Sequence, residues 1–87
     1  MDNWVEAAKA VINFEKSLQI GSEVYAMWTN CYRYRCIKAK IVKINNKSFM
    51  VELIEAKDGY EIGTRINLPN FINPKWSTNN RVFTTEI

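Results

Sequence analysis

Aromatic and arginine side chains are concentrated in one short stretch of this sequence. The aromatic residues are Trp28, Tyr32 and Tyr34, and the arginines beside the two tyrosines are Arg33 and Arg35. Aromatic rings stack on flat ligands, and guanidinium groups bind anions. The stretch is therefore the leading candidate for a binding site, and its chemistry suits a ligand that combines a ring with negative charge.

The orientation of these side chains depends on the strand that carries them. If residues 32–44 form a strand, the two tyrosines share one face and the two arginines the other. Lys38 and Lys40 have the parity of the tyrosines, so rings and cations would follow one strip, as in nucleic-acid-binding sheets. In the alternative interpretation, the tyrosines cover the core and the cations are simply solvated.

Trp76 is a second candidate, because it lies in a loop rich in asparagine and proline. A tryptophan in a loop can act as a lid over a ligand or as an interface anchor. It can also plug the open end of a barrel, and we favour the plug because a large apolar ring seldom stays exposed.

Groups for catalysis or metal binding are missing. The sequence has no histidine, which is the usual base for serine or cysteine nucleophiles. Cys31 and Cys36 have no partner ligands for a structural zinc, which takes four, and no evident base or helix end to activate them. The carboxylates are scattered and form no catalytic pair. We therefore predict no enzymatic activity, no cofactor and no metal.

Length and charge set the wider limits. The 87 residues predict a single domain, residues 1–87, with one modest core. The net charge of +3 permits an anionic partner without requiring one. No apolar run approaches the roughly 18 residues of a membrane span, and no cleavable hydrophobic stretch follows Asp2. We expect a cytoplasmic protein with reduced cysteines and no membrane partner.

A helix is predicted for the segment 1–20. Asn3 and Glu6 have the spacing of a capping box, and Gly21 is suited to end the segment. The apolar residues at helical spacing are Trp4, Ala8, Val11, Ile12 and Leu18. We expect this stripe to be buried, either against the rest of the chain or against a second copy in a homo-oligomer.

From Gly21 onward the apolar residues alternate, which predicts strands in the segment 21–87. A tight connection at Asn30-Cys31 and turns at Asn45-Asn46 and Asp58-Gly59 separate them, and a change of apolar parity predicts a bulge at 41–42. The expected strands cover residues 24–29, 32–44, 49–54, 60–68 and 81–87. Together these elements predict a mainly β, α+β fold, with an N-terminal helix and a five-stranded bent antiparallel sheet or small barrel.

The segment from Gly21 to Val51 resembles the start of a Tudor-type domain, a Src-homology-3-like barrel. The matching residues are Gly21, Val24-Tyr-Ala26-Met-Trp28, Tyr32, Tyr34, Ala39-Lys-Ile41 and Phe49-Met-Val51. The resemblance implies a small barrel in which Trp28 and Tyr32 match aromatics of the family's cage for methylated side chains. This chain lacks the family's acid after the first-strand aromatic, and its turn at residues 55–59 differs. The resemblance therefore implies the barrel more than the cage.

These features predict a small non-enzymatic module that captures an anionic, ring-containing ligand, either nucleic acid or a nucleotide. The predicted ligand-binding residues are Trp28, Tyr32, Arg33, Tyr34, Arg35, Lys38, Lys40 and Trp76. The alternative is a protein-interaction or inhibitor domain that docks on an acidic or nucleic-acid-binding surface of a partner protein. Abundant lysine, asparagine and isoleucine indicate an AT-rich genome, so a phage-encoded inhibitor is one form of this alternative.

Overall fold

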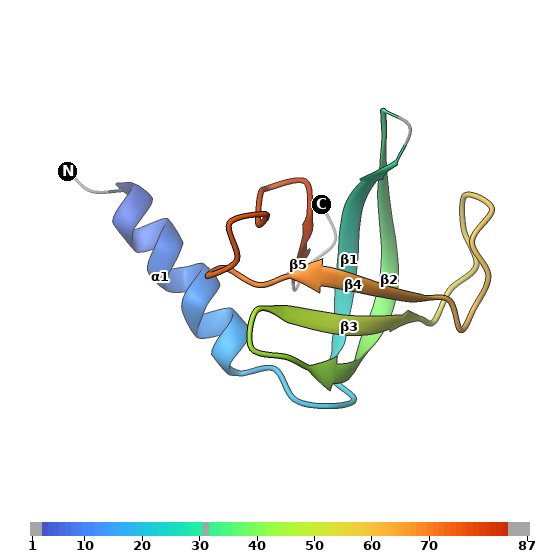
Figure 1. Cartoon of the computed structure of the whole chain (residues 1–87), viewed down its shortest axis with the longest axis horizontal. Helices are drawn as coiled ribbons and strands as arrows, with labels where there is room; N and C mark the ends of the chain where they lie inside the picture. The colour runs from blue at the N-terminus through green and yellow to red at the C-terminus, as the bar shows by residue number, and fades with distance from the viewer. Residues whose placement is uncertain (1–2, 31, 84–87) are drawn as a thin grey trace.

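One helix and five strands make up the fold. The computed structural model describes residues 3–30 and 32–83. The elements are α1 (Asn3–Lys16), β1 (Glu23–Asn30), β2 (Arg33–Ile44), β3 (Ser48–Leu53), β4 (Arg65–Pro69) and β5 (Arg81–Phe83). The strands form one antiparallel sheet in the order β4-β3-β2-β1-β5, which curls into a half-barrel (Figure 1). The predicted fold class, an N-terminal helix followed by a five-stranded bent antiparallel sheet, is confirmed.

The inner face of the curled sheet forms the core. Strand residues alternate between two faces, so the apolar positions of one parity come together inside the curl. Val24 lies opposite Ala39, and Ile41 lies opposite Val51. The most deeply buried large side chains are Val24, Ile37, Ile41, Val51, Leu53 and Val82.

A bulge interrupts β2 where its apolar parity changes. Ile41 pairs with Val51, but the next pair joins Lys43 to Met50, so the register shifts at this point. An extra residue in one strand bends it and increases its twist. The bulge predicted at residues 41–42 is confirmed, and it helps β2 to curve around the core.

Both predicted β-turns are present. Asn45 donates a backbone hydrogen bond to the carbonyl of Ser48 at 2.9 Å. Asp58 and Gly59 have φ of 53° and 86°, and Lys57 pairs with Tyr60 on either side of them. Two successive positive φ values are typical of the tight hairpin turn that favours Asp-Gly.

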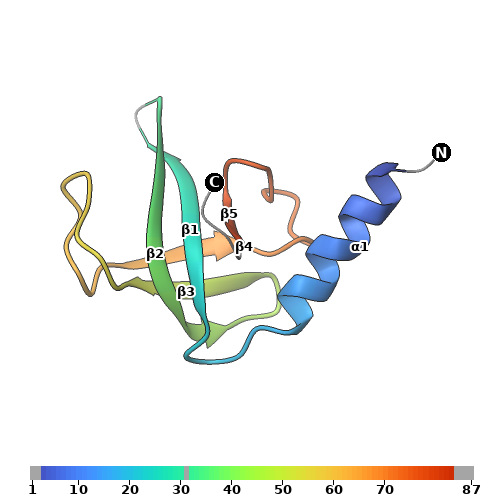
Figure 2. The same ribbon diagram turned by 180° about the vertical axis from the view of Figure 1, so that it is seen from behind.

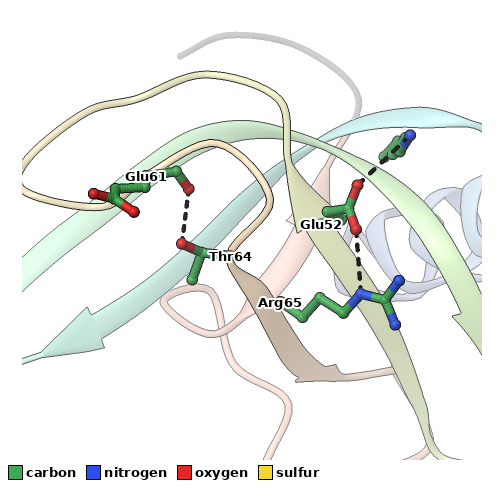
Figure 3. A network of polar contacts seen from close by, with 5 residues as sticks. Glu52, Glu61, Thr64 and Arg65 are labelled. Carbon is green, nitrogen blue, oxygen red and sulfur yellow. Dashed lines mark hydrogen bonds and ion pairs between the residues drawn. The ribbon is translucent and has the colours of Figure 1, made fainter.

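The strand predicted for residues 60–68 is shorter, and this part of the prediction is wrong. Gly63 has φ of 94°, which breaks the extended conformation, and the Thr64 hydroxyl donates a hydrogen bond to the Glu61 carbonyl at 2.7 Å (Figure 3). β4 therefore begins only at Arg65. The residues before it form a loop, in which Ile62 is exposed.

The helix is also shorter than predicted, and its apolar stripe is only partly buried. α1 ends at Lys16, and Phe14 in its last turn and Leu18 just beyond it pack against the core. The N-terminal part projects beyond the sheet in both views (Figures 1 and 2). Trp4 is consequently 74% exposed and Ile12 is 37% exposed in the single chain. Burial against the rest of the chain is therefore wrong for these two residues, whereas burial against a second copy stays a prediction.

Some predicted features lie outside the described residues. They are Asp2, Cys31 in the first connection and residues 84–87 of the expected last strand. Within the described ranges, no helix has the length and apolar character needed to cross a membrane.

Candidate functional site

The β1–β2 hairpin carries the aromatic and arginine stretch and extends away from the rest of the sheet (Figure 1). Arg33 and Tyr34 pair with Asn30 and Thr29 near its end. Tyr32 precedes the strand, with φ of 65° and a fully exposed side chain. Tyr34 is 63% exposed, and Arg33 is exposed with no ion pair to any described residue. We call Tyr32, Arg33 and Tyr34 the hairpin tip.

The expectation that Tyr32 and Tyr34 share one strand face is wrong. β2 begins at Arg33, and the positive φ of Tyr32 takes that residue out of the extended conformation in which side chains alternate. Tyr32 therefore belongs to the connection before β2 and Tyr34 to the strand itself, so the two residues do not share a strand face.

The inner face at the base of the hairpin carries a second group of side chains. Arg35 has the parity of the buried Ile37 and lies opposite Trp28. The rings of Trp28 and Tyr60 meet edge to face, with centroids 5.2 Å apart. The guanidinium carbon of Arg35 lies 6.0 Å from the Tyr60 ring centroid. We call Trp28, Arg35 and Tyr60 the Trp28 cluster.

Two hydrogen bonds join the loop that carries Tyr60 to β2. Lys57 Nζ donates to the carbonyl of Cys36 at 3.3 Å, and the backbone N–H of Ile54 donates to the carbonyl of Lys38 at 3.0 Å. Tyr60 is not among the predicted site residues, because the alternating apolar pattern placed it within a strand. The Asp58-Gly59 signal, which marks a hairpin immediately before it, could have placed it in a loop.

Arg35 combines partial burial with an unused donor. Its Nε atom is inaccessible to water and has no hydrogen-bond partner among the described residues. A buried donor without a partner costs free energy. A hydrogen bond from the guanidinium group to a bound anion would remove this cost. The contact with Tyr60 gives it partial compensation.

The outer face of β2 carries Lys38 and Lys40, and both side chains are in ion pairs. Lys38 Nζ lies 3.3 Å from Glu23, and Lys40 Nζ lies 3.6 Å from Glu52. Glu52 also accepts from Arg65 Nε at 3.2 Å (Figure 3). The hydrogen bond and the charge of Glu23 raise the pKa of Lys38. The cations on this face are thus balanced by carboxylates, in contrast to Arg33 at the hairpin tip.

Trp76 belongs to the long loop between β4 and β5 and is half-buried there. Its ring lies 4.8 Å from the Phe71 ring, and the Arg81 guanidinium carbon lies 6.0 Å from its centroid. These contacts join the indole to its own loop and to β5. None of the described contacts joins it to the hairpin tip.

The same loop is tied to α1 through a carboxylate. Glu15 Oε1 accepts a hydrogen bond from the backbone N–H of Phe71 at 2.9 Å. Burial raises the pKa of Glu15, against smaller opposing effects from that N–H and from the indole N–H of Trp76. The charged form is therefore partly desolvated in the folded protein.

An open groove of about 340 Å³ lies beside Trp28, between β1 and β4. Its polar lining includes Asn67, Lys75 and Asn80, and Ile66 contributes to its apolar wall. Asn80 accepts a hydrogen bond from the Thr29 N–H at 3.3 Å, which fixes this side of the groove. The groove offers one flat ring, one cation and amide groups, a set that suits a heterocycle with polar edges.

Metal-binding clusters of three or more histidine, cysteine or acidic side chains do not occur within the described ranges. No family model matches the sequence, and no curated protein or solved structure shows a significant similarity to it.

Proposed function

We propose that this protein binds single-stranded nucleic acid through the hairpin tip and the adjoining Trp28 cluster. The observation that carries the proposal is the exposure of Tyr32 and Tyr34 on a projecting hairpin, on either side of Arg33, whose cation has no ion pair with any described residue. Base stacking on such rings is tolerant of sequence, and arginine supplies the charge for the phosphate backbone.

The electrostatics favour a single strand over a duplex. Duplex-binding proteins usually concentrate positive charge on one face, whereas Lys38, Lys40 and Arg65 are paired with Glu23 and Glu52. One exposed arginine between two rings suits a strand whose unstacked bases supply part of the affinity.

The shape of the site favours a polymer over a free nucleotide. Pockets for small ligands enclose most of the ligand surface, whereas the hairpin tip is exposed and the groove beside Trp28 is open. A strand could place one base on a tip tyrosine and a neighbouring base in the groove, where Asn67 and Lys75 offer donors.

Fluorescence anisotropy with a labelled oligonucleotide, measured over a range of salt concentrations, tests this function. Tyr32→Ala and Tyr34→Ala should each weaken binding at every salt concentration by about 1–3 kcal/mol, roughly 5- to 150-fold, if a base stacks on each ring. Tyr32→Phe keeps the ring and should bind like the parent.

Arg33→Ala should weaken binding and reduce the slope of log K against log salt by about 0.7, the value for one lost contact to a single strand. Lys43→Ala is the matched control, because Lys43 is an exposed cation at the opposite end of β2. Equal slopes for the two variants, or parent-like binding by all tip variants, would contradict the proposal. Binding of a mononucleotide as tight as that of the oligonucleotide would replace the polymer with a pocket ligand.

The exposed tyrosines also favour a second candidate, docking on an acidic partner protein. Tyrosine and arginine are enriched at the centres of protein interfaces, and the hairpin tip combines both. A protein that binds no oligonucleotide, but binds an acidic protein in a manner abolished by the same tip substitutions, would support this alternative.

A further inference from the structure

We propose that two copies of this chain associate through α1, with the two helices antiparallel around a two-fold axis. The surface involved is an apolar groove between α1, the β2–β3 connection and the start of the β4–β5 loop. We call it the helix groove, and its apolar lining consists of Ile12, Leu18, Ile44, Phe49, Phe71 and Ile72.

The helix groove is large and its rim is exposed. Its volume is about 310 Å³, which is enough for an indole side chain. Ile72 is 66% exposed and Ile44 is 46% exposed on its rim, beside Ile12 of the helix. A contiguous apolar surface of this kind on a small protein is typical of an interaction site.

The same helix carries a side chain that could fill the groove of a second copy. Trp4 is 74% exposed on the part of α1 that projects beyond the sheet (Figures 1 and 2). At 1.5 Å per residue, Trp4 lies about 12 Å along the helix axis from Ile12. Antiparallel helices that cross near Ala8 would place each Trp4 opposite Ile12 at the edge of the partner's helix groove, so a two-fold axis makes the contact twice.

The exposed area supports a second copy as the occupant. The chain exposes 5908 Å², whereas a compact monomer of 10.2 kDa exposes about 5300 Å². The excess of roughly 600 Å² approaches the approximately 800 Å² per partner that a stable interface buries. The projecting part of α1 contributes to this excess, together with the projecting β1–β2 hairpin, and a second copy would cover the helix part.

Antiparallel pairing also suits the helix dipoles. It places the N-terminal half of each α1 beside the C-terminal half of its partner, so the two dipoles oppose one another, which is the favourable arrangement.

The helix itself requires further contacts. α1 has 14 residues, and helices of this length are marginal in water without tertiary packing. Among its described side chains, Phe14 in the last turn packs against the core, as does Leu18 just after the helix. Pairing with a second α1 would supply the missing contacts to the N-terminal turns and would give each assembly two hairpin tips.

Sedimentation velocity over a concentration series, without nucleic acid, tests the proposal. We expect the parent to sediment at twice the 10.2 kDa chain mass, and Trp4→Glu and Ile72→Glu to sediment as monomers. Ile62→Glu is the matched control, because Ile62 is equally exposed, at 67%, but lies on the loop before β4. This control should remain dimeric.

Circular dichroism on all three variants verifies that the fold is kept, which is expected because each substituted side chain is exposed. A parent that is monomeric at every concentration would overturn the proposal and leave the groove to a different partner. A dimer that survives both Trp4→Glu and Ile72→Glu would also overturn it. Because these measurements contain no oligonucleotide, they are independent of the proposed function.

Discussion

At the scale of single residues, the aromatic and arginine stretch does not act as one unit. Tyr34 points to the outer face of the sheet, whereas Arg35, the next residue, lies with Trp28 on the inner face. Tyr32 belongs to neither face, because it precedes the strand. The stretch therefore supplies an exposed hairpin tip and a separate half-buried cluster, and the two groups can contribute different contacts to one ligand.

The ionisation of Glu15 is coupled to folding, because burial raises the pKa of its carboxyl group. Its raised pKa means that the folded state holds the proton more tightly than the unfolded chain does. Stability contributed by the protonated form is then present at low pH and decreases as pH rises from the ordinary glutamate range, near 4.5, through the folded pKa.

We therefore predict that Glu15→Gln gains stability relative to the parent as pH increases. Glutamine retains an oxygen that can accept the Phe71 N–H bond but has no charge to desolvate. Melting temperatures of both proteins between pH 4 and pH 7 provide the measurement. A difference that stays constant across this range would show that the carboxyl group is not perturbed as described.

At the scale of elements, the loop between β3 and β4 determines where Tyr60 lies. Its Asp58-Gly59 turn needs positive φ at both positions, and the hydrogen bond from Lys57 to the Cys36 carbonyl holds the loop against β2. Tyr60 then contacts Trp28 and Arg35 on the inner face of the sheet. The geometry of one short turn thus positions a ring in the Trp28 cluster.

We predict that Gly59→Ala destabilises the protein by about 1–2 kcal/mol, the cost of left-handed backbone for a residue with a Cβ. No atom lies within 4 Å of the added methyl group, so the backbone conformation is the source of the cost. Asp58→Asn is the control, since asparagine tolerates positive φ. Urea denaturation should show a lower midpoint for Gly59→Ala only, and equal midpoints would contradict this account.

At the scale of the whole molecule, one curled sheet provides both the core and the surfaces. Its inner face buries the apolar side chains of all five strands, including Ile66 at the margin. The curl of the sheet also brings the loop before β4 to the base of the β1–β2 hairpin. It brings the β4–β5 loop to α1 as well. The core and the proposed binding surfaces therefore both depend on the curvature of a single sheet.

We predict that Leu53→Ala costs about 2–5 kcal/mol, the usual range for removing a buried leucine side chain. Leu53 has no exposed surface and contributes to the only core cluster that the described residues form. Because small domains are stable by about 5–15 kcal/mol, the melting temperature should fall markedly. Ile62→Ala, at an exposed position, should change stability by less than about 0.5 kcal/mol. A small effect at Leu53 would contradict a single shared core.

Local signals were sufficient for much of the fold. Alternating apolar residues predicted β1, β2 and β3, a parity change predicted the bulge after Ile41, and Asp58-Gly59 predicted its turn. These features depend on neighbours within a few residues, because strand alternation and turn conformation are properties of the local backbone. The same signals overestimated the strand before Arg65, since alternation continued through a segment that Gly63 turns aside.

The sequence by itself therefore determined the order of elements, the apolar faces of the central strands and the residue types that could bind an anionic ring. Only the tertiary structure decided that Arg35 lies beside Trp28 and that Tyr60 joins them. It alone also decided that Lys40 is paired with Glu52 and that Trp4 projects into solvent. These outcomes depend on which strands are neighbours, on their register and on the curl of the sheet. The spacing of residues along the chain does not encode such long-range pairings.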